Sequence, residues 1–307
     1  MLNVFSMPRK VTKYLTDCDY RFLINSGYHF YDKMSDEVYL KRLFKARMGC
    51  DCDLDNPRLF NEKLQWLKLN DHNFIYTNMV DKAEAKRYVA ERIGNEYIIK
   101  TLGLWEKFED IEFDTLPKSF VLKCTHDSGG VVIVKDKNSM DYNGICRKIT
   151  KRLNKSFYSL RREWPYKAVK PRIIAEEYME DEKTKELRDY KFFCFNGEPK
   201  CYKVDFDRFI NHRANYFDTD GNILEIGEEV CPPDFEKKIE KPSNLETMLE
   251  FAKILSKGLP FLRVDFYEVN EKIYFGELTF YPASGFGKFL FDGNDELLGS
   301  WLILPEK

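Results

Sequence analysis

The chain has 307 residues, of which 43% are hydrophobic, 15% aromatic and 33% charged, and its mean hydropathy is −0.51. This composition excludes a disordered chain and indicates an aromatic-rich globular protein, whose length predicts about two domains. Lys and Arg total 49 against 51 Asp and Glu, giving a formal charge of −2. No global positive field therefore favours nucleic acid as a partner.

The sequence shows no secretory signal and no membrane span. Its start, MLNVFSMPRKVTKYLTDCDYRF, has no continuous apolar segment before charged residues recur. No run approaches the roughly 20 apolar residues that a spanning helix needs. We therefore expect a cytoplasmic protein that does not span a membrane; its oligomeric state cannot be predicted from one chain.

The eight cysteines, at positions 18, 50, 52, 124, 146, 194, 201 and 231, show no paired CxxC spacing. Several lie within expected strands, so we expect reduced thiols in the core. Cys50 and Cys52 in MGCDCDLD form one tight pair, but no second Cys or His pair completes four ligands. We expect no metal site there.

The first part of the chain is expected to be helical up to about residue 70. YLKRLFKARMG ends at Gly49, and FNEKLQWLKLN carries apolar residues at helical spacing. An amphipathic helix is expected over roughly 82–93, with Asp81 as its N-cap and Gly94 at its end. These helices form an N-terminal extension.

From residue 117 the pattern changes to strands. KSFVLKCT and VVIVKD flank the turn HDSGG and predict a β-hairpin. After a helical stretch near 139–160, the strand segments RIIAEEYM, DYKFFCFN, EPKCYKVDFDR and ANYFDTDG follow. A helix over about 244–257 precedes a last hairpin, RVDFYEV and KIYFGELTF, which turns near Asn270. The expected fold is α+β in three parts, 1–116, 117–180 and 181–307.

The hairpin KCTHDSGGVVIVKD has a form suited to phosphate binding. A strand, a glycine-rich turn and a returning strand can fold over a polyphosphate with backbone N–H groups turned inward. Lys123 would add a positive charge beside the turn. An ordinary hairpin, whose glycines only form the turn, explains the same residues equally well.

The last hairpin carries a pair of carboxylates, Asp265 and Glu277, within apolar runs. On adjacent strands both can point into one cleft, where they suit Mg²⁺ that takes its remaining ligands from nucleotide phosphates and water. Thr279 faces the same side as Glu277 because strand side chains alternate. An ion-paired sheet face is the alternative, but an inward carboxylate needs a partner.

Taken in order, FVLKCTHDSGGVVIVKD, RIIAEEYM, LRDYKFFCFNGEPKCYKVDFDR and LRVDFYEVNEKIYFGELTFYPASGFGKF resemble the TupA-like ATP-grasp family, associated with teichuronopeptide and capsule biosynthesis. FNEKLQWLKLND, VDKAEAKRYV and REWPYK also resemble that family, so the similarity runs from about residue 35 onward. It implies an ATP-grasp fold that holds ATP and Mg²⁺ between two β-rich lobes. The segment 117–180 would be the central lid subdomain, and 181–307 the C-terminal subdomain with the metal site.

The resemblance also implies roles for individual residues. The nucleotide-binding residues would be Lys82, Lys123, His126, Ser128, Gly129, Gly130, Glu176, Glu177, Tyr178 and Asp189. Within this set Lys123 would contact the phosphates, 126–130 would form a mobile loop above them, and 176–178 would line the adenine and ribose end. Magnesium would be held by Asp265, Glu277 and Thr279, the last at a position where the wider superfamily commonly has Asn. Lys82 resembles the basic residue that opens the nucleotide domain, although it could simply start a helix.

Further charged residues are candidates for catalysis. Lys191 shares a strand face with Asp189, and the resemblance places both in the cleft. The alternative is that the two side chains belong to a ladder of charged residues on the surface. Arg208 belongs to a basic cluster in VDFDRFINHRANYF that could receive an anionic acceptor. With Arg263 it is a candidate for substrate and γ-phosphate contacts, whereas His212 in the same loop is more typical of a hydrogen-bonding turn residue.

The resemblance implies a ligase reaction in cell-surface polysaccharide biosynthesis. A carboxylate and ATP would give an acylphosphate, which an amine attacks to form an amide; a uronic acid on a glycan and an amino acid are the expected substrates. The protein would then work near a membrane-associated polysaccharide assembly. No protein nucleophile is required, and the four histidines reveal no Ser-His-Asp or Cys-His arrangement in the sequence. The alternative is a glycosyltransferase that uses a nucleotide-sugar on an ATP-grasp-like fold, with Asp205-Phe206-Asp207 as a DxD-type motif.

Overall fold

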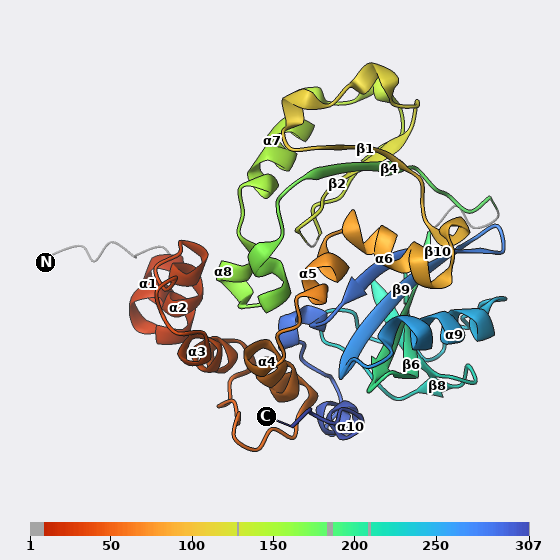
Figure 1. Ribbon diagram of the computed structural model, residues 1–307. Coiled ribbons are helices and arrows are strands. Elements are labelled where there is room, and N and C mark those ends of the chain that lie inside the picture. Colours follow the sequence, from red (N-terminus) through yellow and green to blue (C-terminus); the bar gives the residue numbers. More distant parts are fainter. Residues whose placement is uncertain (1–8, 128, 183–186, 208–209, 307) are drawn as a thin grey trace, which may run out of the picture.

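The computed structural model describes residues 9–127, 129–182, 187–207 and 210–306. Its helices are α1 (Arg9–Thr16), α2 (Cys18–Gly27), α3 (Asp36–Met48), α4 (Phe60–Asn70), α5 (Ile75–Val80), α6 (Glu84–Ile93), α7 (Tyr142–Leu153), α8 (Phe157–Arg161), α9 (Leu245–Ser256) and α10 (Asn294–Trp301). The strands are β1 (Thr101–Trp105), β2 (Phe120–Cys124), β3 (Val132–Val134), β4 (Ile173–Glu177), β5 (Arg188–Phe195), β6 (Glu198–Phe206), β7 (Arg213–Asp218), β8 (Ile223–Leu224), β9 (Phe261–Val269) and β10 (Lys272–Thr279). Two sheets and their covering helices confirm the expected α+β class (Figure 1).

The larger sheet has the strand order β10-β9-β5-β6-β7-β8, and neighbouring strands are antiparallel. Strand β5 lies inside this sheet and is buried on both faces after its first residue, which explains why FFCF at its end is apolar without alternation. Helix α9 packs against β5, β6 and β9. Helices α5 and α6 contact β10, so the N-terminal segment is built onto the larger sheet.

The smaller sheet has the order β1-β4-β2-β3 and is also antiparallel. It has a hydrophobic core of its own, which includes Phe108, Phe120, Leu122, Ile149 and Ala175. Helix α7 contributes to this core and contacts β2. In Figure 1 this sheet and α7 lie above the larger sheet, and the two sheets face each other across the region where the site is found.

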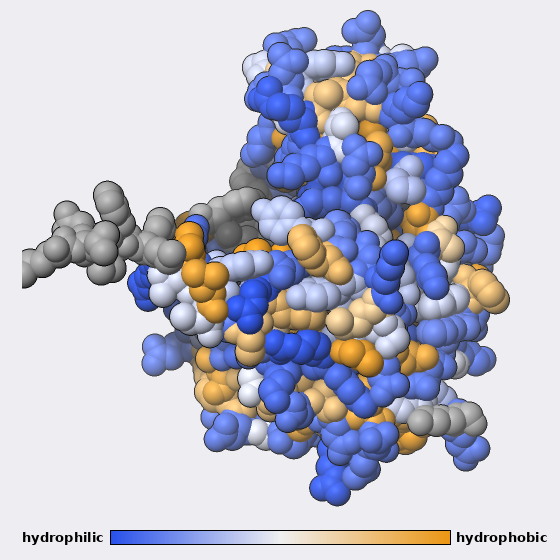
Figure 2. Space-filling view, turned by 90° about the vertical axis from the view of Figure 1, so that its left-hand side faces the viewer, coloured by the Kyte–Doolittle hydropathy of each residue, from blue (hydrophilic) through white to orange (hydrophobic). Residues whose placement is uncertain are grey.

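The N-terminal helices share the core of the larger sheet. Phe22 of α2 and Leu40 and Phe44 of α3 are buried in the same cluster as Phe192 and Phe266. Figure 2 shows the side of these helices: a narrower lobe rises above a wider body, and the surface is mostly hydrophilic with scattered apolar side chains. In the part of the chain that the structure describes, no helix combines the length and hydrophobicity needed to cross a membrane.

Most of the predicted local structure is confirmed. Strands β2 and β3 form the predicted hairpin, and β9 and β10 turn at Asn270, whose φ of 50° is left-handed. Gly49 ends α3 with a φ of 84°. The Asp81 side chain accepts hydrogen bonds from the backbone N–H groups of the next helix start, at 2.8 and 3.2 Å. All eight cysteines are free thiols, but Cys18 and Cys50 are exposed and do not lie in the core as expected. Strand β1, which lies before residue 117, and the two-residue β8 were not predicted from the sequence.

Candidate functional site

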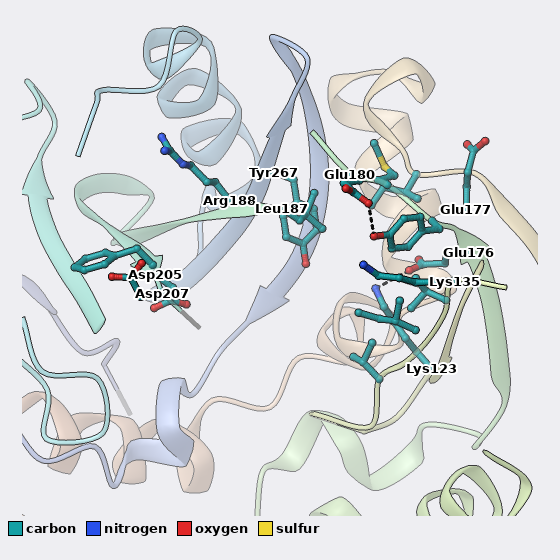
Figure 3. A pocket seen from close by; sticks show the side chains of 17 residues that line it. Lys123, Lys135, Glu176, Glu177, Glu180, Leu187, Arg188, Asp205, Asp207 and Tyr267 are labelled. Atoms are coloured by element: carbon teal, nitrogen blue, oxygen red, sulfur yellow. Dashed lines mark hydrogen bonds and ion pairs between the residues drawn. The ribbon is translucent and has the colours of Figure 1, made fainter. Parts of the chain in front are cut away.

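A cavity of about 360 Å³ lies between the two sheets. Its apolar lining comes from Ile99, Val121, Val131, Ile133, Met179, Leu187 and Tyr267. Its charged lining includes Lys123, Lys135, Glu176, Glu177, Glu180, Arg188, Asp205 and Asp207. Figure 3 shows Lys123, Lys135 and Glu176 on the side of the smaller sheet, with Asp205 and Asp207 at the opposite end. The cavity therefore combines an apolar slot with charged ends, as a bound nucleotide requires.

Glu176 lies at the centre of a buried cluster with two lysines. Strand pairing places Glu176 of β4 opposite Val121 of β2, so it neighbours Lys123 on the sheet. The Lys123 Nζ lies 2.6 Å from Glu176 Oε2, and the Lys86 Nζ from α6 lies 2.5 Å from Oε1. Burial by itself would raise the pKa of Glu176, but the two lysines outweigh it and lower the pKa to about 2. Glu176 is therefore a carboxylate at neutral pH.

A second ion pair joins the start of α6 to the larger sheet. The Lys82 Nζ donates to Glu277 Oε1 at 2.9 Å and to the backbone carbonyl of Asp127 at 2.7 Å. Burial opposes ionisation of Glu277, but Lys82 and Arg263 outweigh it and lower the pKa of this carboxyl group. A small hollow is lined by both clusters, with Lys82, Lys86, Lys123, Glu176 and Glu277 among its residues.

Asp265 lies directly across from Glu277 because the β9–β10 register shifts between Phe275 and Glu277. Gly276 occupies the bulge, where an added Cβ would lie 3.0 Å from the Asp265 carbonyl oxygen. Arg263 donates two hydrogen bonds of 2.7 Å to the Asp265 carboxylate and one of 3.0 Å to Thr279 Oγ1. Burial raises the pKa of Asp265 despite this cation.

Lys191 connects Asp265 to two further carboxylates of the same sheet face. It lies opposite Asp265 on the neighbouring strand, with its Nζ 3.9 Å from Asp265 Oδ2 and 2.9 Å from Asp205 Oδ2. It also forms an ion pair with Asp189. Burial would lower the pKa of Lys191, but the surrounding carboxylates raise it. One face of the larger sheet thus carries alternating cations and carboxylates, of which Asp205 also lines the cavity.

The TupA-like ATP-grasp profile matches residues 62–303, which is most of the chain. The chain belongs to this family. The ATP-grasp fold predicted from the sequence is therefore confirmed. A search of curated proteins found no match.

Solved ATP-grasp ligases resemble the chain only distantly. The D-alanine–D-alanine ligase of Bacillus anthracis complexed with ATP is 17% identical, with a TM-score of 0.38 over 66% of this chain and 53% of the ligase. The D-alanine–D-alanine ligase of Helicobacter pylori is 16% identical, with a TM-score of 0.38 over 73% of this chain and 61% of the ligase. The phosphoribosylamine–glycine ligase of Thermotoga maritima is 15% identical, with a TM-score of 0.40 over 67% of this chain and 48% of the ligase. The chain thus matches about half to three fifths of the length of each of these ligases.

Of the site residues named from the sequence, Lys123, Glu176, Glu177 and Tyr178 line the cavity, and Lys82 and Glu277 line the small hollow. Lys82, Lys123, Glu176, Glu177, Tyr178, Asp189, Lys191, Arg263, Asp265, Glu277 and Thr279 belong to the cavity lining or to the ion-pair clusters described above. Tyr178 donates a hydrogen bond of 2.7 Å to Glu180. Ser128 and Arg208 lie outside the described residues.

The glycine hairpin of this ATP-grasp protein differs from the expectation at His126. We expected His126 in a mobile loop over phosphates, but its side chain is buried and its Nε2 lies 3.1 Å from the Lys155 carbonyl oxygen. The neighbouring Asp127 forms an ion pair of 3.2 Å with Arg152. His126 thus anchors the hairpin to the end of α7, and Gly129 and Gly130 are not among the residues that line the cavity.

Two features of the site were missed in the sequence. Lys86 follows Lys82 by one helical turn, and this spacing was the available sign that both lysines face the same clusters. The second is a contact between two residues without a sequence motif, since the Cys231 Sγ lies 3.4 Å from His212 Nδ1. These two residues are 19 positions apart and come together only through the fold.

Proposed function

We propose that this protein is an ATP- and Mg²⁺-dependent ligase that activates a carboxylate as an acylphosphate and passes it to an amine. The single observation that carries the proposal is the row of cations and carboxylates across the larger sheet, from Lys82 and Glu277 through Arg263 and Asp265 to Lys191. Such a row can neutralise a triphosphate and its metal in a site largely shielded from water. Phosphoryl transfer depends chiefly on this kind of positioning and charge neutralisation.

In this proposal the base of ATP occupies the apolar slot between the sheets. Ile99, Val121 and Leu187 would enclose the ring, and the backbone of 177–180 lies at the same wall. The phosphates would then extend toward Lys123 and Lys82, which come from the smaller sheet and the start of α6. Each lysine has an ion-pair partner in the structure, so phosphate binding exchanges one anionic partner for another.

The donor set on strands β9 and β10 fits magnesium. Asp265 and Glu277 are cross-strand partners that supply hard carboxylate oxygens, and Thr279 adds a hydroxyl oxygen on the same face. Their counter-cations, Arg263 and Lys82, are also suited to bind phosphate oxygens. We therefore assign both carboxylates to the metal and both cations to the phosphates, with the metal supplying charge neutralisation when bound.

The reaction follows from these assignments. A substrate carboxylate oxygen bonds to the γ-phosphorus as the bond to the β-phosphate oxygen breaks and ADP leaves. An amine then attacks the acyl carbon, phosphate leaves, and the amine loses a proton. Arg263 and Lys191 would orient the transferred group and the substrate carboxylate, and Arg208 would add a positive charge to the acceptor side. We propose a uronic acid on a cell-surface glycan as the carboxylate and an amino acid as the amine, handled at the cytoplasmic side of a membrane assembly.

A nucleotide-sugar glycosyltransferase is the alternative that the test must separate. Both members of the DxD-type pair line the cavity, where Asp205 forms an ion pair with Lys191 and Asp207 forms one of 2.5 Å with Lys237. We expect ATP with Mg²⁺ to raise the melting temperature, and a uridine diphosphate sugar to leave it unchanged. ADP release in a screen of uronic acids against amino acids would identify the substrates. Stabilisation by the nucleotide-sugar alone would reject the ligase proposal.

A further inference from the structure

A second group of metal-ligand side chains lies beyond Lys191 from the Asp265–Glu277 pair. Asp205 at the end of β6, His212 just before β7 and Cys231 after β8 offer a carboxylate oxygen, a ring nitrogen and a sulfur within 4.8 Å of one another. Among the residues that the structure describes, no other three His, Cys, Asp or Glu side chains converge as closely. The proposed ATP reaction makes no use of this group.

The distances within the group suit a tetrahedral metal ion. His212 Nε2 lies 3.6 Å from both Asp205 Oδ1 and Cys231 Sγ. The separation of nitrogen from carboxylate oxygen exceeds a hydrogen-bond length. With Zn–S near 2.3 Å and Zn–N and Zn–O near 2.1 Å, a tetrahedral site needs sulfur and nitrogen about 3.6 Å apart and nitrogen and oxygen about 3.4 Å apart. These two separations thus lie within a few tenths of an ångström of the required spacing, and the His212 ring, whose Nδ1 lies 3.4 Å from Cys231 Sγ, must turn for Nε2 to point at a shared ion.

The segment that carries Cys231 is held firmly against the sheet. Buried Asn215 of β7 accepts a hydrogen bond of 2.9 Å from the Asp234 backbone N–H and donates one of 2.6 Å to its carbonyl. On the other side of Cys231, the Glu229 backbone N–H donates to Lys288 at 2.9 Å. Asp205 is fixed in β6, where its Oδ2 receives the Lys191 ammonium and its Oδ1 faces His212. Ligands held in this way need little rearrangement to bind an ion.

We propose that Asp205, His212 and Cys231 bind one zinc ion, at a site distinct from the magnesium site proposed above. A thiolate and an imidazole favour zinc over magnesium, which prefers oxygen ligands. Three protein ligands leave the fourth position for water or an exchangeable group. The His212 side chain is 38% exposed, which gives the ion a path from solvent. Because Asp205 also lines the cavity, the ion would border the nucleotide site.

Zinc binding requires Cys231 as the thiolate, so the thiol proton is released to solvent as the Zn–S bond forms. The full-length protein, cleared of metal with a chelator, is titrated with zinc chloride by calorimetry in excess Mg²⁺ and without nucleotide. We expect one tight equivalent. Cobalt(II) in place of zinc should give the charge-transfer absorption of a thiolate–cobalt bond.

Variants assign the ion to these side chains. Cys231→Ser should abolish the charge-transfer band, and His212→Gln should weaken zinc binding at least about tenfold, since even changes around metal ligands cost that much. His212 is half-exposed, so its replacement tests the site even if Cys231→Ser perturbs folding. Cys18→Ser, at an exposed cysteine, and Glu277→Gln should bind zinc like the wild type. Failure of the wild type to bind one equivalent, or unchanged binding in His212→Gln, would overturn the proposal.

Discussion

Lys82 and Glu277 are 195 positions apart in the chain, yet the Lys82 Nζ donates to Glu277 Oε1 across 2.9 Å. This contact ties the segment just before α6 to the last strand of the larger sheet. Both side chains are largely buried, at 16% and 31% exposure. A nucleotide that recruits Lys82 would therefore release Glu277 for magnesium, which couples phosphate binding to metal binding in the proposed site.

The first prediction concerns Glu277→Gln. The amide fills nearly the same volume but removes the charge that the proposed metal requires, so we expect a folded protein with Mg²⁺-dependent ATP turnover lowered by roughly 100-fold or more. The rate of ADP release at several magnesium concentrations measures this. Glu198→Gln is the matched control, because this half-exposed carboxylate pairs with Lys253 on the surface. A variant with the wild-type rate and the same magnesium requirement would exclude Glu277 as a metal ligand.

Lys123→Met tests the phosphate end of the cavity. A charged hydrogen-bond donor to phosphate is worth about 1.5–3 kcal/mol, so we expect ATP affinity to fall about ten- to a hundredfold. Calorimetric titration with a non-hydrolysable ATP analogue gives the dissociation constant. Lys118→Met provides the control, since its side chain is 73% exposed and pairs with Asp136 outside the cavity. Equal affinities of the two variants would remove Lys123 from the phosphate site.

Glu176 predicts a pH dependence of stability. A carboxyl group whose pKa is lowered by folding stabilises the folded state above its unfolded pKa, and this stabilisation disappears as pH falls to the folded pKa. For Glu176 the window runs from the ordinary value of 4.5 down to about 2, and the stabilisation is on the order of 3 kcal/mol. The difference in unfolding free energy between the wild type and Glu176→Gln should therefore shrink as pH falls through this window. Denaturant titrations at pH 6 and pH 3 measure this difference in unfolding free energy. A difference that does not change with pH would contradict the ion pairs of Glu176 with Lys86 and Lys123.

The sequence predicted the local elements and the pairs that lie within one hairpin. Asp265 and Glu277 could be placed in one hairpin because β9 and β10 are consecutive, but the bulge at Gly276 that sets them opposite each other could not be predicted. The partners of Lys82 and Glu176 could not be predicted, because strand and helix patterns identify buried faces but not which distant elements meet. Strand β1, with the sequence TLGLW, was missed because it is only five residues long and has a glycine at its centre.

His126 illustrates a different limit. A histidine beside glycines in a turn is compatible with phosphate binding, and the resemblance to the TupA-like ATP-grasp family implied that role. In the structure the His126 Nε2 lies against the Lys155 carbonyl oxygen, and burial lowers the pKa of His126, so the side chain anchors the hairpin. For Cys231 and His212 the sequence failed in the opposite way: no motif indicated that they interact, yet the β6–β7 and β8–α9 connections bring them into contact.

The last prediction tests the packing of α10, near the C-terminus, against the segment before α4. Gly299 of α10 lies against the segment before α4, where an added Cβ would be 2.1 Å from the Arg58 carbonyl oxygen and 2.9 Å from the Phe60 nitrogen. In an exposed helix interior, Gly→Ala stabilises by up to about 1 kcal/mol, but here backbone atoms occupy the space and must shift. We expect Gly299→Ala to cost about 1–3 kcal/mol, as other overpacked sites do, and to lower the melting temperature by several degrees. Gly27→Ala, at the end of α2 with no atom within 4 Å of the added Cβ, should melt at or slightly above the wild-type temperature. If Gly299→Ala melted with the wild type, the close approach of α10 to the start of α4 would be wrong.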